Sequence, residues 1–143
     1  MVNRDVVAAK LSDLALRVAR ARKHQKTTSV ELLADPDALD LVAFNLMLAV
    51  QICADIASHI IADAGWPGAR TLAEAFGRLH ERGVLTQPTS AALSRAAGLR
   101  NVVAHGYANV DVNLVHAAAN EGARDLDAFA REVATWLSGQ GSG

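Results

Sequence analysis

The sequence predicts an all-α fold, a single-domain bundle of about five helices, and three observations support this. The chain has 143 residues, enough for one hydrophobic core and too few for two. Its residues are 51% hydrophobic but only 4% aromatic, and much of the apolar content is alanine, which suits closely packed helices better than a β-sandwich. Apolar side chains also recur at helical spacing, and no segment has the pattern of a convincing strand.

The first helix is predicted from apolar residues spaced three and four apart, at Val7, Leu11, Leu14 and Val18. It ends in a basic cluster that contains no acid: Arg17, Arg20, Arg22, Lys23 and Lys26. Six acids and no lysine or arginine follow between Thr27 and Ala69. These charges are either two solvated faces of opposite sign, or the basic end of the first helix contacts a polyanion.

A short second helix is expected to begin with a Ser29 cap and to stop at Pro36. Residues 37–64 then form a long helix that is apolar nearly all round, so we expect it to be buried on most sides. The sequence Gly-Trp-Pro-Gly at 65–68 ends it.

The next helix is expected from Thr71 to about Arg82, because Thr71 and Glu74 form a capping box and Gly83 is a C-terminal stop. Pro88 suits the first turn of a further helix. Asp111 could cap a last helix, in which apolar residues recur at Leu126, Phe129, Val133 and Trp136. Residues 1–138 are thus expected to form the helical domain, and 139–143 a disordered tail.

Composition also limits the classes of protein. A formal net charge of −1 gives no global attraction to nucleic acid, so any contact with RNA must come from local patches. The single cysteine, Cys53, cannot form an internal disulfide, which favours a reducing compartment. No signal peptide is evident, and the charge-free stretch from Leu41 to Ala54 is shorter than the roughly 20 residues of a membrane span. We therefore expect a cytoplasmic protein with no membrane contact.

A polar stripe lies on the long helix. Gln51, Asp55 and His59 fall within about 100° of helix surface, together with Ser58. Asp55 and His59 are four residues apart, close enough for a direct hydrogen bond. The stripe either faces solvent, or lines a shared interface or a wet cleft, because polar groups are costly to bury without partners. We expect a homodimer whose contact uses this helix near Gln51 and Asp55.

The segment Arg-Asn-Val-Val-Ala-His-Gly-Tyr at 100–107 gathers four polar side chains at a predicted helix end. In a helix Asn101 and His105 share a face, while Arg100 and Tyr107 would share a neighbouring one. Gly106 is well placed to end the helix in a left-handed turn. This can be an ordinary helix end with a histidine near the negative end of the dipole, or a site able to bind phosphate and transfer a proton.

The spacing Arg100-x4-His105-x-Tyr107 resembles the R-x4-H-x-Y motif of HepT-type toxins in the HEPN superfamily, and the likeness extends over roughly residues 4–137. It implies a homodimeric toxin of a type VII-like HEPN/MNT toxin–antitoxin pair. Such a toxin is a metal-independent endoribonuclease, paired with an MNT-type nucleotidyltransferase as antitoxin. The resemblance further implies that the antitoxin attaches AMP to Tyr107. Gln51 stands where many relatives have glutamate, so no acid–base role follows for the long helix.

The residues fit that chemistry. The ribose 2′-OH is the nucleophile, so no metal or cofactor is expected. His105 can take its proton, Arg100 can bind the phosphate oxygens, and Asn101 can orient His105 or donate to the phosphate. The substrate is RNA, with tRNA and mRNA as candidates. The alternative is a non-catalytic helical partner that docks a minimal nucleotidyltransferase, and it needs only the dimer surface and an exposed Tyr107.

Overall fold

The chain folds as a helical bundle, and the computed structural model describes residues 2–105 and 111–140, with 99–105 described by their backbone alone. In chain order the elements are α1 (Arg4–His24), α2 (Ser29–Leu33), α3 (Pro36–Ala64), α4 (Leu72–Glu81), α5 (Gln87–His105), α6 (Val112–Ala117), the π-helical turn η2 (Ala118–Gly122) and α7 (Ala123–Gln140). No strand occurs among these residues. The all-α prediction is therefore confirmed.

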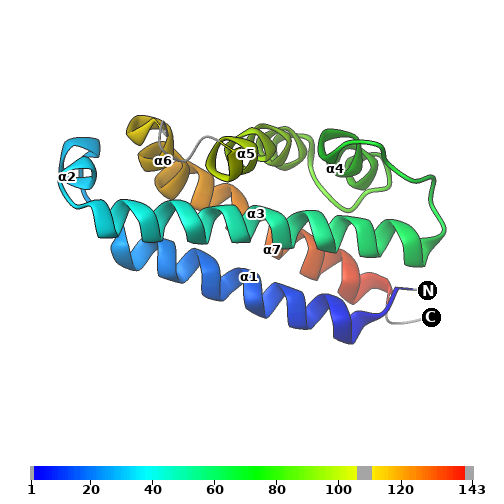
Figure 1. Cartoon of the computed structure of the whole chain (residues 1–143). Coiled ribbons are helices and arrows are strands. Elements are labelled where there is room, and N and C mark those ends of the chain that lie inside the picture. Colours follow the sequence, from blue (N-terminus) through cyan, green and yellow to red (C-terminus); the bar gives the residue numbers. More distant parts are fainter. Residues whose placement is uncertain (1, 106–110, 141–143) are drawn as a thin grey trace.

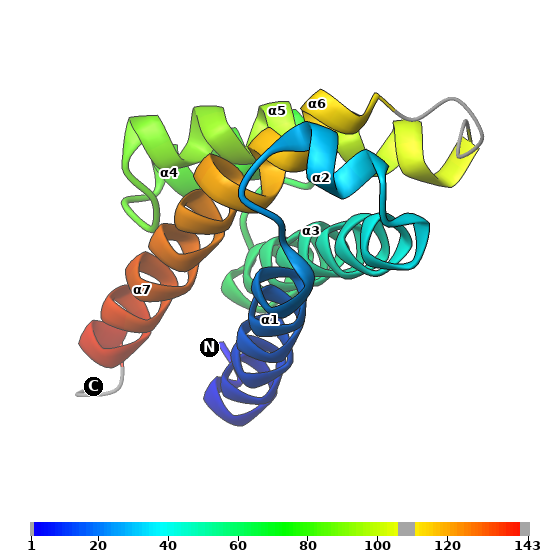
Figure 2. The same cartoon turned by 90° about the vertical axis from the view of Figure 1, so that its left-hand side faces the viewer.

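The long helices α1 and α3 lie side by side and antiparallel, as Figure 1 shows. Helix α7 packs against both of them, and α4 and α5 cover the other side of α3 (Figures 1 and 2). The short second helix is present as α2, whereas the last helix, which Asp111 was expected to begin, is divided into α6, the π-helical turn η2 and α7. Helix α6 is too short for its apolar period to stand out in the sequence.

Burial of α3 organises the core. Thirteen of its residues are buried, among them Leu46, Ile56 and Ile60, as the apolar pattern predicted. Phe76 from α4 and Phe129 from α7 meet edge to face, with ring centroids 6.1 Å apart, and both are fully buried. One stripe of α3 remains open to solvent and includes Leu41, Phe44, Asp55 and Ser58. The helix is thus buried on most sides and not on all.

The helix ends follow their predicted caps with two corrections. Thr28, not Ser29, is the N-cap of α2, because its hydroxyl accepts from the N–H of Glu31 at 3.1 Å. Pro36 does not stop a helix but is the first residue of α3, where a missing N–H costs nothing, and Asp35 caps it through the N–H of Ala38. Gly65 and Gly83 adopt left-handed conformations, with φ of 72° and 79°, after α3 and α4.

Three further expectations are confirmed. The Thr71 hydroxyl accepts from the N–H of Glu74 at 3.0 Å, Pro88 lies in the first turn of α5, and Asp111 caps α6 through the N–H of Asn113 at 2.9 Å. The expected tail is partly wrong, since Gly139 and Gln140 continue α7. Residues 141–143 lie outside the described part of the chain.

Among the described residues, α3 alone is long and apolar enough to cross a membrane. Over half of its most apolar window, 56%, is buried inside the bundle. Such burial is the pattern of a core helix.

The start of α5 is fixed by a carboxylate from α7. Glu132 accepts from the N–H of Thr86 at 2.7 Å through one oxygen and from the Thr89 hydroxyl at 2.6 Å through the other. Thr89 is only 5% exposed, so its hydroxyl has little access to water. These are short, charge-assisted bonds between segments more than 40 residues apart, and they set the position of the helix that carries Arg100 and His105.

We expect Glu132→Ala to lower the free energy of unfolding by about 1–3 kcal/mol, because it leaves a buried hydroxyl and a helix-terminal N–H without their acceptor. Urea-induced unfolding followed by circular dichroism measures the change. Glu121→Ala removes an exposed acid of the π-helical turn η2 and should change stability by less than about 0.5 kcal/mol. Equal stability of the two variants would contradict the assigned role of Glu132.

Candidate active site

The motif lies in the last two turns of α5. The backbone is helical through Arg100, Asn101 and His105, and the helix ends at His105, as the sequence predicted. In Figure 2 these turns extend past α3 to the edge of the molecule. Gly106 and Tyr107 lie outside the described residues, so the predicted left-handed turn and the exposure of Tyr107 stay predictions.

The helical repeat places the motif relative to the rest of α5. Leu93 is fully buried and anchors the middle of the helix, and the Ser94 hydroxyl donates to the Ser90 carbonyl at 2.9 Å. Positions 101 and 105 fall on the same face of the helix as Ser94 and Gly98, because they follow Ser94 by seven and eleven residues. Leu93 lies about 100° around the helix from Ser94, so this face borders the core side of α5.

The side chains of the polar stripe on α3 have other partners than the sequence predicted. Asp55 accepts from the Gln51 side-chain amide at 3.0 Å, and His59 turns toward Asp63, with 2.9 Å between Nε2 and the carboxylate oxygen. No direct bond joins Asp55 to His59, so that expectation is wrong. The Nε2 atom of His59 is buried. It lies within ion-pair distance of Asp63, but the geometry is not that of a hydrogen bond. Gln51, Asp55 and Asp63 each have partners within the chain, so the stripe is mostly satisfied internally.

Five of the six exposed large apolar side chains among the described residues lie near the same end of the bundle as the last turns of α5, and the sixth, Leu16, lies on α1. The five lie on α2, on the first turns of α3 and on α6, at this end in Figure 1: Val30, Leu33, Leu41, Phe44 and Leu114. Phe44 is 47% exposed and lies on the α3 stripe, seven residues before Gln51. The α3 stripe is therefore apolar toward its start and polar toward its middle.

Much of the basic cluster is paired within the bundle. Arg22 lies 2.7 Å from Asp127, Lys26 lies 3.3 Å from Asp35, and Arg17 donates to Asn45 at 3.2 Å. The N–H of Ala38, and then Lys26, hold the pKa of Asp35 below its usual range. These pairs favour the interpretation of the cluster as a surface neutralised by its own acids.

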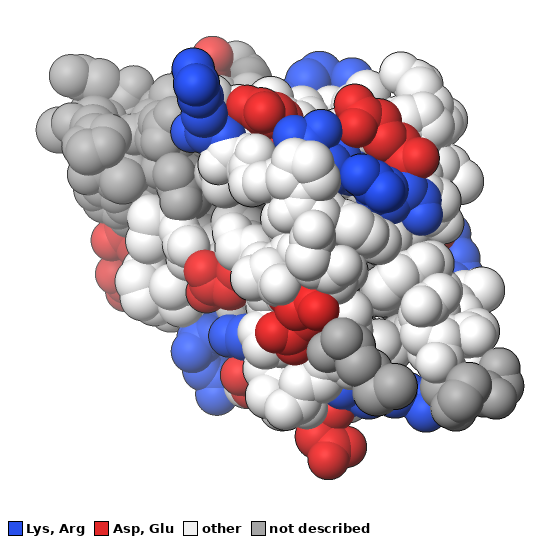
Figure 3. All heavy atoms as spheres, turned by 90° about the vertical axis from the view of Figure 1, so that its right-hand side faces the viewer, with Lys and Arg blue, Asp and Glu red and all other residues white. Residues whose placement is uncertain are grey.

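Charges are mixed on other faces as well. On α4 the Arg78 guanidinium lies 3.4 Å from Glu74 and 3.1 Å from Glu81. Figure 3 shows acidic and basic side chains interleaved over one face of the molecule, with no broad field of one sign there. Attraction of a polyanion therefore depends on local cations without acidic partners.

Two histidines with no role predicted from the sequence hold loops. His116 Nε2 lies 3.0 Å from the Lys26 carbonyl and 3.2 Å from that of Thr27, which ties the α1–α2 connection to α6. His80 Nδ1 lies 3.0 Å from the Leu85 carbonyl, just before α5. Both nitrogens must carry a proton to donate to carbonyls. These contacts join segments distant in sequence or close a local turn, and no pattern of residues signals them.

Other reactive groups of the described residues are not arranged for metal chemistry. No group of three histidine, cysteine or carboxylate side chains gathers there. Burial raises the pKa of the Cys53 thiol, which keeps it protonated and unreactive. Burial also raises the pKa of the Asp125 carboxyl beside α5, an effect that Arg95 opposes and Glu121 reinforces.

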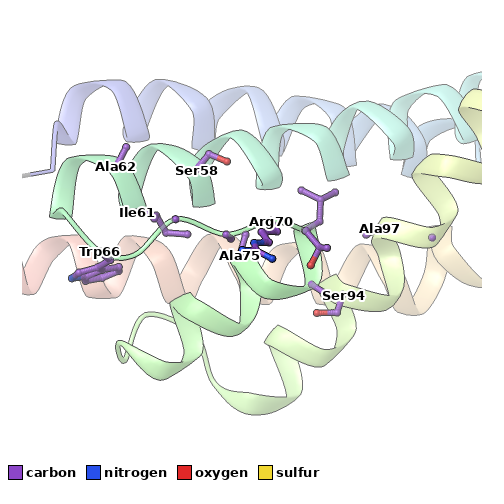
Figure 4. Close-up of a pocket in the computed structure, with 14 residues that line it drawn as sticks. Ser58, Ile61, Ala62, Trp66, Arg70, Ala75, Ser94 and Ala97 are labelled. Carbon is purple, nitrogen blue, oxygen red and sulfur yellow. The ribbon is translucent and has the colours of Figure 1, made fainter.

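A groove of about 760 Å3 opens between α3, α4 and α5, and no pattern in the sequence predicted it (Figure 4). Ser58 contributes from α3, Arg70 and Thr71 from the segment just before α4, and Ser94 and Gly98 from α5. Among the described residues that line it, Arg70 is the only charged one. Its α5 wall lies on the helix face that carries positions 101 and 105, which connects the groove to the motif.

Comparison with known proteins gives a consistent result. A family model described as Ribonuclease HepT-like matches residues 13–133. The mRNA nuclease HepT of Shewanella oneidensis is 29% identical over 90 residues, which cover 63% of this chain and 68% of that protein.

Solved structures share the fold at lower identity. A toxin–antitoxin structure with AMP-PNP superimposes with a TM-score of 0.85 at 22% identity, and covers 92% of this chain and 99% of its own. The tri-AMPylated HEPN toxin of Shewanella oneidensis in complex with its MNT antitoxin gives 0.84 at 22% identity, over 93% and 99%. The cytosolic protein YutE of Bacillus subtilis gives 0.85 at 13% identity, over 99% and 95%.

The family match covers most of the chain, and the fold is that of solved HEPN toxins. The family that the R-x4-H-x-Y motif predicted is thus confirmed. The chain belongs to the ribonuclease HepT-like family.

Proposed function

We propose that this protein is the toxin of a HEPN/MNT toxin–antitoxin pair and acts as a metal-independent endoribonuclease. One observation carries the proposal: in a chain of the HepT-like family, α5 holds Arg100, Asn101 and His105 in its last two turns, at the edge of the bundle. An RNA strand can approach such an end without unfolding the core. The proposal places the protein in the cytoplasm, where its RNA substrate is.

The reaction needs a base and a cation at the scissile phosphate. His105 takes the proton of the ribose 2′-OH, and the oxygen then attacks the adjacent phosphorus. Arg100 binds the non-bridging oxygens as charge builds on them, with Asn101 orienting His105 or donating a further hydrogen bond. The bond from phosphorus to the 5′ oxygen breaks. The products are a 2′,3′-cyclic phosphate and a 5′-hydroxyl end.

The leaving 5′ oxygen needs a proton, and one motif holds no second acid for it. We infer that two copies of the chain face each other, so that the second His105 or a tyrosine supplies that proton. The exposed stripe of α3 supports this inference, since Phe44 and Leu41 are 47% and 41% exposed and continue into Gln51 and Asp55. Exposed apolar side chains grouped beside a site are typical of an interaction surface.

The partner in this proposal is a cognate MNT-type nucleotidyltransferase. Two observations support it: the solved HEPN toxin of Shewanella oneidensis is tri-AMPylated and bound to an MNT antitoxin, and this chain has its fold. We propose that the cognate enzyme transfers AMP to Tyr107. An AMP group there puts an anion and a bulky adenosine near Arg100, where they compete with the RNA phosphate.

His105→Ala and Arg100→Ala should abolish growth inhibition and RNA cleavage without loss of helical content. Removing a positioned base costs about 10²–10⁴ in rate, and removing the cation costs on the order of 10²–10³. Purified variants incubated with total RNA, with circular dichroism as the folding check, measure both effects.

Cleavage by the unmodified protein should persist in excess EDTA, because no described group of side chains is arranged to hold a metal. Loss of cleavage on chelation would contradict the mechanism, and so would full cleavage by His105→Ala. If the folded wild-type protein cleaves no RNA while binding its nucleotidyltransferase, the protein is a non-catalytic partner.

Phe44→Glu should convert a dimer of 15.0 kDa chains into a monomer and reduce RNA cleavage at least about tenfold, because it puts a charge into the apolar part of the α3 stripe. Light scattering at micromolar concentration measures the mass. Leu16→Glu is the matched control, since Leu16 is 46% exposed on α1 and lies outside this stripe. A monomeric mass for the wild-type protein would overturn the dimer.

Co-expression with the cognate nucleotidyltransferase should add one or more AMP groups to the protein, each of roughly 329 Da, on the Tyr107 hydroxyl. Intact mass spectrometry and peptide mapping detect them, and Tyr107→Phe should carry none. If Tyr107→Phe is modified and silenced as the wild type is, the transferase neutralises the toxin in another way, with occlusion of the site as the remaining explanation.

A further inference from the structure

We infer that the groove between α3, α4 and α5 binds a phosphodiester of the RNA strand other than the scissile one, with Arg70 as its cationic contact. The inference rests on the proposed ribonuclease function and assigns a strand-binding subsite to it. Figure 4 shows Ser58 of α3 on one side of the groove, Ser94 of α5 on the other, and Arg70 between them.

The charge of the groove fits an anion. The Arg70 guanidinium has no ion pair or hydrogen bond with any described residue, and no described acid lines the groove. The nearest acid in sequence, Glu74, is already engaged, because it accepts from the Arg70 backbone N–H at 3.1 Å and pairs with Arg78. The Ser58 hydroxyl, also without a described partner, adds a neutral donor. A guanidinium and a hydroxyl across an open groove match phosphate oxygens.

The segment that carries Arg70 is held in place from two sides. Arg78 donates to the carbonyls of Pro67 at 3.0 Å and Gly68 at 3.4 Å. Trp66 packs edge to face on Trp136 at 5.8 Å between centroids. The backbone of Arg70 is therefore positioned before any ligand arrives, which lowers the entropy lost on binding.

The groove leads to the motif. Ala97 and Gly98 form its α5 wall, and Gly98 lies three residues before Asn101 on the same helix face. Three residues of α-helix span about 4.5 Å along the axis. A strand that follows this face from positions 105 and 101 toward Gly98 therefore enters the groove that Arg70 lines.

The shape favours a single-stranded nucleic acid over a protein segment. Small side chains line much of the groove: Ala62, Ala69, Ala73, Ala97 and Gly98. It contains none of the exposed large apolar residues, which lie on α1, α2, the start of α3 and α6. Protein interfaces are commonly marked by exposed apolar patches, whereas a cation in a groove of small side chains suits the phosphate backbone of a single strand.

Binding can be tested apart from cleavage with a fluorescent RNA of about ten nucleotides in which every 2′-hydroxyl is methylated, since such RNA is not cut. Fluorescence anisotropy should show about tenfold weaker binding for Arg70→Ala. The slope of log K against log salt should also fall by about 0.7, as expected for one lost phosphate contact on a single strand. On cleavable RNA, Arg70→Ala should raise KM about tenfold and leave kcat within about twofold.

The control variants distinguish an effect of the charge in the groove from an effect of side-chain size or of misfolding. Arg131→Ala removes an exposed arginine of α7 that lies outside the groove, and it should leave binding unchanged. Ala62→Glu should weaken binding and Ala62→Lys should not, although both add a long side chain at the same exposed position of α3. Circular dichroism confirms the fold of each variant.

Unchanged binding in both Arg70→Ala and Ala62→Glu overturns the subsite. Normal RNA binding together with loss of neutralisation by the nucleotidyltransferase in Arg70→Ala also overturns it and makes the groove a protein interface. Arg70-dependent binding without any wild-type cleavage supports the groove and removes the proposed function. If the wild type cleaves RNA and Arg70→Ala binds and cleaves it equally well, the proposed function is supported and the subsite is overturned.

Discussion

The burial of α3 is the constraint on which the rest of the structure depends. Thirteen of its residues are buried, and no single neighbour can cover so much of a helix surface. Helices α1, α4, α5 and α7 each pack against one side of it. The stripe left over, from Leu41 through Phe44 to Asp55, is the part of α3 that none of the described helices covers. The long apolar helix that forms the core therefore also leaves this stripe exposed.

Polar contacts between separate segments then position the elements around the candidate site. Glu132 fixes the start of α5, His116 fixes the α1–α2 connection, and Arg78 fixes the segment before α4. Each uses one side chain to satisfy two backbone or hydroxyl groups that helix ends and loops leave open. The apolar core decides that the helices pack, and these contacts decide how the last turns of α5 stand relative to the groove.

The sequence predicted what depends on near neighbours. Gly65, Gly83 and Asp111 end or begin helices for reasons within one turn of the chain, and the helical end of α5 follows from the same reasoning. The site motif was predictable as a spacing on one helix. The pairing of Asp55 with Gln51 was not, because residues three and four apart offer several equivalent partners. The Arg70 groove was not predictable either, since its walls come from three helices.

The π-helical turn at Ala118–Gly122 has a consequence for how this helix can vary in length. A π-helical turn holds one residue more than an α-helical turn needs, so loss of one residue there would leave a regular helix. Such a turn holds its extra residue by widening, so the parts before and after it would keep nearly the same relative rotation. His116 would still face the carbonyls of Lys26 and Thr27, and Glu132 would stay at the start of α5. A one-residue deletion at this turn would thus shorten the connection from α6 to α7 and leave the contacts at both of its ends in place.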